Sequence, residues 1–170
     1  MIKYRGFTLI ELLVVIAIIA ALAAIGYPMT QSVVAKSREA ACTIKLRSLG
    51  VALQSYLQEN QNIMPVLSNA RAALTDEIPV IETLLLPYLE SPGSFQCPAD
   101  KQQFAKTGSS YQWNSTQNGL HITQLSFFGI TDRPDKIPLI TDKEAWHPGG
   151  TNFLYADLSS SSKPRFVTGN

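Results

Sequence analysis

Residues 7–25 read FTLIELLVVIAIIAALAAI, an apolar run whose one formal charge is Glu11. About 20 apolar residues, at 1.5 Å of helix each, suffice to cross the hydrocarbon core of a bilayer. Lys3 and Arg5 precede the run, so the positive-inside bias predicts a cytoplasmic N-terminus with the rest of the chain outside. A cleavable secretory signal is the alternative, because small residues at 20–24 offer a cleavage site, but the run is long for such a signal.

Glu11 is costly at this position. A charged residue near the centre of a spanning helix costs about 2.5–3.5 kcal/mol on insertion scales. Pairing with a cation greatly reduces the cost of a carboxylate in hydrocarbon. We therefore expect Glu11 to have a partner and the segment to serve assembly as well as anchoring. The simpler interpretation is a polar residue tolerated near the membrane interface.

The stretch RGFTLIELL, residues 5–13, resembles the leader junction of type IV pilins and type II secretion pseudopilins. The resemblance implies that prepilin peptidase cleaves after Gly6 and that the new N-terminal residue, Phe7, is N-methylated. Glu11 then becomes the fifth mature residue, for which the family's proposed role is to pair with the N-terminal amine of a neighbouring subunit. Residues i and i+4 are neighbours on a helix, so a pair between Phe7 and Glu11 of one chain is also open.

A second helical segment follows the apolar run. Residues 29–60 contain no proline, and apolar residues recur there at helical spacing, namely Cys42, Leu46, Leu49, Leu53, Tyr56 and Leu57. This pattern predicts an amphipathic helix with one face on a core. A continuous helix over 7–60 would be roughly 80 Å long at 1.5 Å per residue. We expect a kink at Pro28, and two separate helices broken there are the alternative.

The remaining sequence predicts short elements between turns. Residues 76–90 form a candidate short helix, with a capped start at 76–79 and Pro87 near its end. Candidate strands lie at 111–113, 122–128, 139–140, 152–156 and 165–167, and the serine run 159–162 is expected to be a surface loop. The fold class is therefore α+β and pilin-like. A long N-terminal helix, half transmembrane and half amphipathic, packs on a small, mostly antiparallel β-sheet.

The resemblance divides the chain into three parts. These are a cleaved leader (1–6), a transmembrane and assembly helix (7–28), and an extracytoplasmic head (29–170) that includes the amphipathic half of the helix at about 29–60. The formal net charge is +1, and removal of the leader leaves 12 basic against 13 acidic residues. This balance argues against nucleic-acid binding and suits subunits that pack closely without self-repulsion.

The chain has two cysteines, Cys42 and Cys97. The head is expected outside the cytoplasm, where an even count favours a disulfide. The bridge would close a loop of about 55 residues and stabilise the head by up to about 4 kcal/mol. Two buried free thiols are the alternative. Two cysteines alone do not make a zinc site, which needs further ligands.

Residues 147–157, HPGGTNFLYAD, extend the resemblance. They are similar to the His-x9-Asp-Gly motif that ends the members of a pseudopilin-like group abundant in some bacterial lineages. Fragments at 41–46, 64–65, 95–100 and 110–114 also agree with that group. Leu158 stands where the group has glycine. If that glycine serves a turn with positive φ, Leu158 is strained, unless the turn differs or the strand continues.

His147 and Asp157 are weak candidates for metal ligands. Secretion pseudopilins of the major type often hold calcium in an acidic C-terminal loop, but the acidic residues here are scattered and without EF-hand spacing. Histidine suits transition metals better than calcium. We expect a structural His147 and no cofactor. The sequence also shows no nucleophile elbow and no phosphate-binding glycine loop, so we expect no enzyme.

These observations predict a structural pseudopilin-like subunit of a bacterial inner membrane, with its head in the periplasm or on an extracytoplasmic fibre. It would assemble through its N-terminal helix into a type II secretion pseudopilus or a type IV pilus-like fibre. Its partners would be prepilin peptidase, copies of itself or related pilin-like subunits, the secretion or pilus assembly machinery, and the membrane. The alternative is a membrane-anchored surface module that binds a ligand without polymerising.

Overall fold

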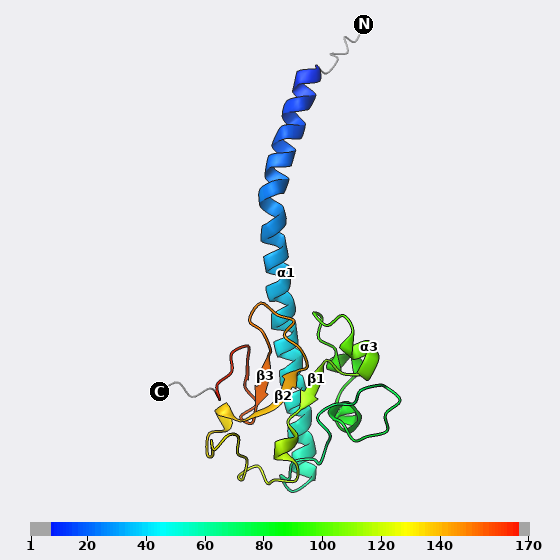
Figure 1. The fold of residues 1–170 in the computed structure, drawn as a ribbon, viewed down its shortest axis with the longest axis vertical. Helices are drawn as coiled ribbons and strands as arrows, with labels where there is room; N and C mark the ends of the chain where they lie inside the picture. The colour runs from blue at the N-terminus through cyan, green and yellow to red at the C-terminus, as the bar shows by residue number, and fades with distance from the viewer. Residues whose placement is uncertain (1–7, 167–170) are drawn as a thin grey trace.

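A single long helix, α1 (Leu9–Glu59, 51 residues), dominates the computed structural model, which describes residues 8–166. The helix is gently curved and carries the head on its C-terminal half (Figure 1). It runs without interruption through Pro28, so the alternative of two helices broken there is wrong. Proline removes one hydrogen bond and bends a helix, but the hydrogen bonds of the turns on either side keep it continuous.

The head covers one face of α1 from Cys42 onward. Cys42, Leu46, Leu49 and Leu53 are at most 1% exposed, as the amphipathic pattern predicted. Ile44 and Val51 lie on the opposite face, exposed. Gly50 permits close contact with the sheet, because a Cβ there would lie 3.1 Å from a methyl carbon of Leu154.

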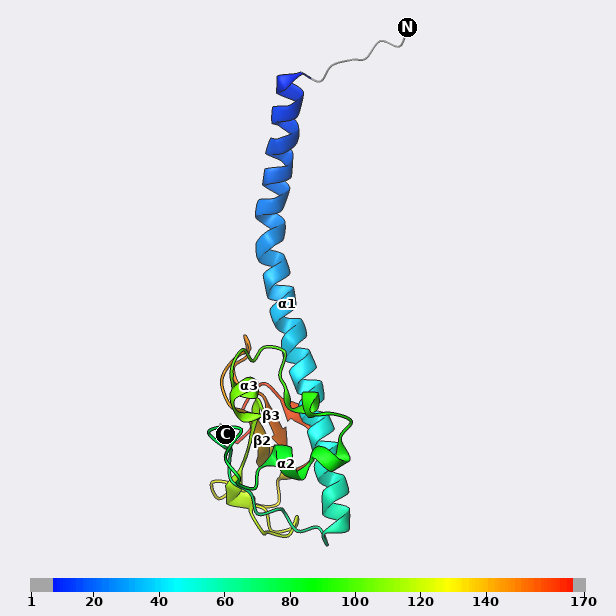
Figure 2. The same ribbon diagram turned by 90° about the vertical axis from the view of Figure 1, so that its right-hand side faces the viewer.

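A four-stranded antiparallel sheet packs on this face of α1 (Figure 2). Its strands are β1 (Tyr111–Trp113), β2 (Pro138–Asp142), β3 (Phe153–Tyr155) and β4 (Ser160–Ser161), adjacent in chain order. Tyr111 pairs with Asp142 and Trp113 with Ile140, which sets the register between β1 and β2. The long helix on a small antiparallel sheet is the α+β, pilin-like architecture expected from the sequence.

Two of the predicted strands are absent from the part of the chain that the structure describes. Residues 122–128 form turns, because the Gln117 side chain holds the backbone of Ser126 at both its N–H and its carbonyl oxygen. Residues 165 and 166 also lie outside any strand, and Val167 lies outside the described residues. In contrast, the serine run expected to be a loop contains β4, because Ser160 and Ser161 pair with β3.

The short helices also differ from the expectation. The predicted helix over 76–90 shrinks to α2 (Ile81–Leu84) and a following 3-10 turn, η1 (Leu86–Tyr88). Asp76 starts no helix, since its carboxylate accepts the N–H groups of Ala72 and Ala73 instead. Further 3-10 turns are η2 (Pro92–Phe95), η3 (Ser115–Gln117) and η4 (Pro134–Lys136).

One helix was missed, α3 (Gln103–Thr107). Asp100 accepts the N–H groups of Gln102, Gln103 and Phe104 at its start, and Gly108 ends it at φ +82°. An aspartate before a helix and a glycine after it are known sequence signals, so Asp100 and Gly108 could have predicted α3.

Leu158 adopts a positive φ, so the strain expected for a leucine at the motif's glycine position is present. It lies at φ +62°, in the turn between β3 and β4. Its N–H donates to the carbonyl of Tyr155, and the N–H of Tyr155 donates to the carbonyl of Ser159, both at 2.9 Å. Hairpins of this kind favour glycine at the left-handed position. The departure from the His-x9-Asp-Gly motif therefore places a leucine at a left-handed position where glycine fits better.

We expect Leu158→Gly to be more stable than Leu158→Ala by about 1 kcal/mol, because both variants lose the leucine side chain and only glycine relieves the positive φ. The measurement is denaturant unfolding of the full-length protein in detergent. The same pair of variants at exposed Gln96, where φ is −100°, is the control and should show the usual order with alanine more stable. An alanine variant as stable as the glycine variant at position 158 would contradict the strain.

Candidate functional site

The N-terminal half of α1 exposes its apolar surface on all sides. Leu9 is 82% exposed and Ile25 is 73% exposed, and the large apolar residues between them are also exposed. The helix is long and apolar enough to cross a membrane, judged by length and composition alone. An apolar surface of this extent marks a segment that another phase or another protein covers.

Glu11 lies in the first turn of α1 and takes part in a capping box with Thr8. Its Oε2 accepts hydrogen bonds from the backbone N–H of Thr8 at 2.9 Å and from the Thr8 hydroxyl at 2.8 Å. The Thr8 hydroxyl in turn accepts from the N–H of Glu11 at 3.3 Å. The carboxylate therefore satisfies a backbone donor that the helix start would otherwise leave unpaired.

This geometry adds a role that the sequence interpretation missed. The spacing Thr8-x-x-Glu11 is the signature of a capping box and was available as a signal. Both contacts use Oε2, and Oε1 has no hydrogen-bond partner within residues 8–166. Gly6 and Phe7 lie outside the described residues, so leader cleavage, N-methylation and the pair with the Phe7 amine stay predictions.

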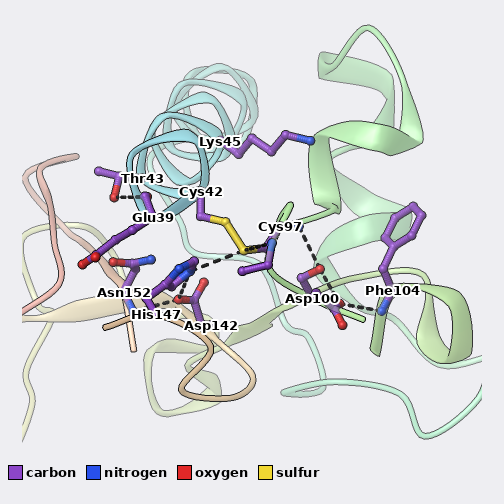
Figure 3. Close-up of a disulfide and its surroundings, with 12 residues drawn as sticks. Glu39, Cys42, Thr43, Lys45, Cys97, Asp100, Phe104, Asp142, His147 and Asn152 are labelled. Atoms are coloured by element: carbon purple, nitrogen blue, oxygen red, sulfur yellow. Dashed lines mark hydrogen bonds and ion pairs between the residues drawn. A yellow bond between two sulfur atoms is a disulfide. The ribbon is translucent and has the colours of Figure 1, made fainter. Parts of the chain in front are cut away.

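A disulfide joins Cys42 of α1 to Cys97, with their Cα atoms 5.0 Å apart (Figure 3). Both residues are fully buried. Cys97 follows the 3-10 turn η2, and its N–H donates to the hydroxyl of Ser110 beside β1. The bridge therefore ties the long helix to the middle of the head, across a separation of 55 residues.

His147 and Asp142 lie beside the disulfide (Figure 3). The Nε2 atom of His147 is 3.4 Å from Cys97 Sγ and 3.4 Å from Asp142 Oδ2. Burial raises the pKa of Asp142 to about 7 and lowers the pKa of His147. Because both shifts favour the uncharged forms, the contact between these two groups is weak as an ion pair.

Several buried polar atoms around His147 have no hydrogen-bond partner among the described residues. They are Asp142 Oδ1, His147 Nδ1, the Tyr111 hydroxyl, and both side-chain polar atoms of Asn152. Most buried polar atoms in folded proteins are paired, and each unpaired one costs about 1–3 kcal/mol. Such a concentration is unusual for a part of the head whose only task is packing.

The structure does not pair His147 with Asp157. Asp157 is exposed, and its Oδ1 accepts from the N–H and hydroxyl of Ser159 in the turn after β3. The carboxylate beside His147 belongs to Asp142, the last residue of β2. A tight turn, in which Gly150 N–H donates to the His147 carbonyl, folds the β2–β3 connection back over that strand end. The acidic residue closing an apolar strand was the signal that sequence reasoning passed over.

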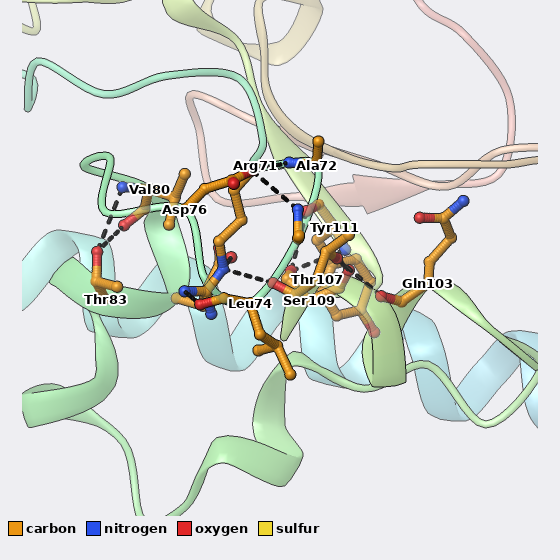
Figure 4. Close-up of polar contacts among 12 residues, drawn as sticks. Arg71, Ala72, Leu74, Asp76, Val80, Thr83, Gln103, Thr107, Ser109 and Tyr111 are labelled. Carbon is orange, nitrogen blue, oxygen red and sulfur yellow. Dashed lines mark hydrogen bonds and ion pairs between the residues drawn. The ribbon is translucent and has the colours of Figure 1, made fainter.

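A second buried polar cluster ties the loop before α2 to α3 (Figure 4). The Arg71 guanidinium lies 3.0 Å from Glu82 and donates to the carbonyl of Thr107. Lys143 donates to the Thr107 hydroxyl. Burial raises the pKa of Glu82 and lowers the pKa of Lys143. All of its members are used in holding loops together, and the cluster is structural.

Residues 1–27 match the family model described as the prokaryotic N-terminal methylation motif. No curated protein and no solved structure gives a significant match to the chain. The match and the fold together are consistent with a type IV pilin-like or pseudopilin protein. Within that class, the motif supports a substrate of prepilin peptidase, and the apolar helix supports a membrane anchor. The motif covers the leader and the start of α1, and it says nothing of the head.

We expect loss of the disulfide to destabilise the head by up to about 4 kcal/mol, because the bridge removes the entropy of a 55-residue loop from the unfolded chain. Denaturant unfolding of the Cys42→Ala/Cys97→Ala double variant measures this loss. Thiol labelling of unfolded, unreduced wild-type protein is the companion test. Modification of both cysteines in that sample would show that the bridge does not form.

Proposed function

We propose that this chain is a structural, pseudopilin-like subunit. Prepilin peptidase cleaves it after Gly6 and methylates Phe7, and the mature protein assembles through α1 into a type II secretion pseudopilus or a type IV pilus-like fibre. The carrying observation is an apolar helix half that the head leaves uncovered, headed by a single carboxylate. The N-terminal methylation motif over residues 1–27 supports this assignment.

The helix has two environments that suit its apolar half. Lipid covers it while the subunit is anchored in the inner membrane, with the N-terminus cytoplasmic and the head in the periplasm. Neighbouring α1 helices cover it in the fibre. Because lipid and helix surfaces are both apolar, hydrophobic burial alone gives little preference for the fibre. The preference must come from packing and from polar groups, and Glu11 is the one ionised side chain in residues 7–26.

Glu11 favours the move of α1 from lipid into the fibre because one of its carboxylate oxygens remains available to accept a hydrogen bond. Its Oε2 caps its own helix through Thr8, and Oε1 has no partner within the described chain. The amine created at Phe7 of a neighbouring subunit supplies the cation for that oxygen. A charge-assisted hydrogen bond of this kind is roughly twice as strong as a neutral one. It satisfies two groups that are both costly in hydrocarbon.

We propose that the head moves with α1 as one body during assembly, a role that requires neither catalytic activity nor a cofactor. The continuous α1 connects the assembling segment directly to the core of the head, since the same helix supplies Leu46, Leu49 and Leu53. Displacement of the helix therefore moves the head with it. Other pilin-like subunits and the secretion or pilus machinery are the proposed partners.

Mass spectrometry of the mature protein should find Phe7 at the N-terminus, carrying a methyl group. The physical basis is the leader junction over residues 5–13 within the matched motif. Internal peptides that contain phenylalanine, such as those from the head, should be unmethylated and provide the control. A mature N-terminus at residues 20–24 would instead identify an ordinary secretory signal.

Glu11→Gln should leave membrane insertion intact and abolish incorporation into fibres, as should Glu11→Ala and Glu11→Leu. Glutamine keeps the capping box, so the change removes the charge specifically. Thr8→Ala is the matched control, because it weakens the cap by about 1 kcal/mol and keeps the carboxylate. The measurement compares sheared fibre and membrane fractions from cells that carry the assembly machinery. Assembly by Glu11→Gln, or its loss in Thr8→Ala alone, would remove the pairing argument.

The same experiment separates this proposal from the surface module that binds a ligand without polymerising. Such a module stays in the membrane fraction whether or not Glu11 is present. The wild-type protein in the sheared fraction therefore supports the fibre, and its absence there supports the module.

A further inference from the structure

Four side chains that bind transition metals converge in the buried cluster at the disulfide. Cys42, Cys97 and His147 each offer a ligand atom, and these three atoms lie within 4.8 Å of one another. The fourth is Asp142, whose Oδ2 is 3.4 Å from the Nε2 of His147. The side chains of His147 and Asp142 are both fully buried. They come from α1, the loop before α3, the end of β2 and the β2–β3 turn.

We propose that the reduced head binds one zinc ion through Cys42, Cys97, His147 and Asp142, and that the disulfide is the oxidised alternative of the same site. Two cysteines alone were insufficient for this conclusion. The fold supplies the two further ligands, and four protein ligands complete a tetrahedral structural site. The proposal concerns the head and is independent of how α1 assembles.

Two distances around His147 Nε2 fit a metal better than they fit hydrogen bonds, and the two sulfur atoms, which are bonded to each other in the disulfide, separate when the metal binds. Zinc bonds of about 2.0–2.3 Å at tetrahedral angles separate neighbouring ligand atoms by roughly 3.3–3.8 Å. The contacts of His147 Nε2 with Cys97 Sγ and Asp142 Oδ2 are both 3.4 Å. The second is long for an N–H···O hydrogen bond, which is usually about 2.7–3.2 Å. Moreover, Nε2 carries at most one proton and cannot donate to both neighbours, whereas a cation satisfies both.

The surroundings supply the supporting contacts that a metal site needs. The N–H of Ala99 lies 3.4 Å from Cys97 Sγ, where it stabilises a thiolate. The N–H of Asn152 donates to Asp142 Oδ2 at 2.8 Å. When Nε2 binds the metal, Nδ1 of His147 becomes the donor that orients the ring. That atom is buried and has no hydrogen-bond partner in the disulfide form, and the side-chain oxygen of Asn152 is a second buried atom without a partner.

The local charge also favours a cation. Asp142 places a buried carboxylate beside His147, and Glu39 lies near the same cluster (Figure 3). A divalent ion would neutralise the two thiolates and offset these negative groups. The cysteine sulfurs and the imidazole select a borderline transition metal such as zinc over calcium or magnesium.

Both states form from the reduced dithiol with simple chemistry. Zinc binding forms two Zn–S bonds and releases the two thiol protons. Oxidation instead forms the Cys42–Cys97 bond by thiol–disulfide exchange, in which an oxidant of the disulfide class becomes two thiols. The newly made chain supplies the thiols, so no reductant is required. Because both cysteines are fully buried in the folded head, the metal enters during folding.

The direct test refolds the full-length protein in detergent, under a phosphine reductant, with cobalt as a spectroscopic probe for zinc. We expect one Co²⁺ per chain, with thiolate-to-cobalt charge transfer and the intense d–d bands of tetrahedral coordination, and displacement by Zn²⁺. The protein refolded with its disulfide closed should bind less than a tenth as much. Failure of the reduced wild-type protein to bind cobalt would overturn the proposal.

Two ligand variants and two matched controls test the assignment. His147→Gln and Asp142→Asn should each weaken cobalt binding at least tenfold and change the d–d bands. His121→Gln replaces the chain's other histidine, and Asp157→Asn replaces an exposed aspartate near the motif end; both should bind like wild type. Unchanged binding by His147→Gln would show that the cysteines alone chelate the ion and would overturn the four-ligand site.

Protection of the thiols is a measurement that needs no variant. With glutathione disulfide as oxidant, stoichiometric Zn²⁺ should slow closure of the Cys42–Cys97 bond at least tenfold in wild-type protein. Magnesium at the same concentration is the control and should have no effect. An equal rate of closure with and without zinc would count against the site even if a ligand variant failed to fold.

Discussion

The apolar surface of α1 exceeds what the head can cover, and the organisation of the molecule depends on this imbalance. From Cys42 onward one face of the helix forms the centre of the core. Over residues 9–27 the same helix presents apolar side chains in every direction, and these side chains are exposed. The head is therefore built on one end of an element whose other end requires a membrane or further helices. Folding of the head consequently covers only one part of the helix.

Sequence reasoning succeeded where a structural signal was local. The apolar run and the repeat from Cys42 to Leu57 each lie within one helix, so their periodicity placed α1 and its buried face. Tyr111 to Trp113 is a short segment between turns with two aromatic residues, one on either side of Gln112, and it forms β1. The expected helix over 76–90 failed because Asp76 caps Ala72 and Ala73 before it; this contact is local, but the sequence does not say which side an aspartate caps. Ser160 and Ser161 have little strand preference, and they form β4 only because the turn at Leu158 returns them to β3.

The candidate sites show the same division. Glu11 was predicted to be functional because a single charge within an apolar run is visible in the sequence itself. Its bonds to Thr8 were equally local and were overlooked. The fold brings together four segments that are distant in sequence, and these segments supply Cys42, Cys97, His147 and Asp142. Composition and spacing could not predict this cluster. Sequence analysis grouped His147 with Asp157 as weak candidates for metal ligands because both belong to one motif, whereas the β2–β3 turn brings Asp142 to His147.

The position of the disulfide also sets how the subunit responds to mechanical load. In the fibre proposed above, a pull along its length would apply tension between the start of α1 and whatever holds the head. The residues between Cys42 and Cys97 form a covalently closed loop, so tension passes through the two sulfur atoms and bypasses the 55-residue span. At about 3.4 Å per residue, closure removes roughly 190 Å from the length to which the chain can be drawn out. The long helix can thus unravel under force while most of its packed face inside the head stays shielded.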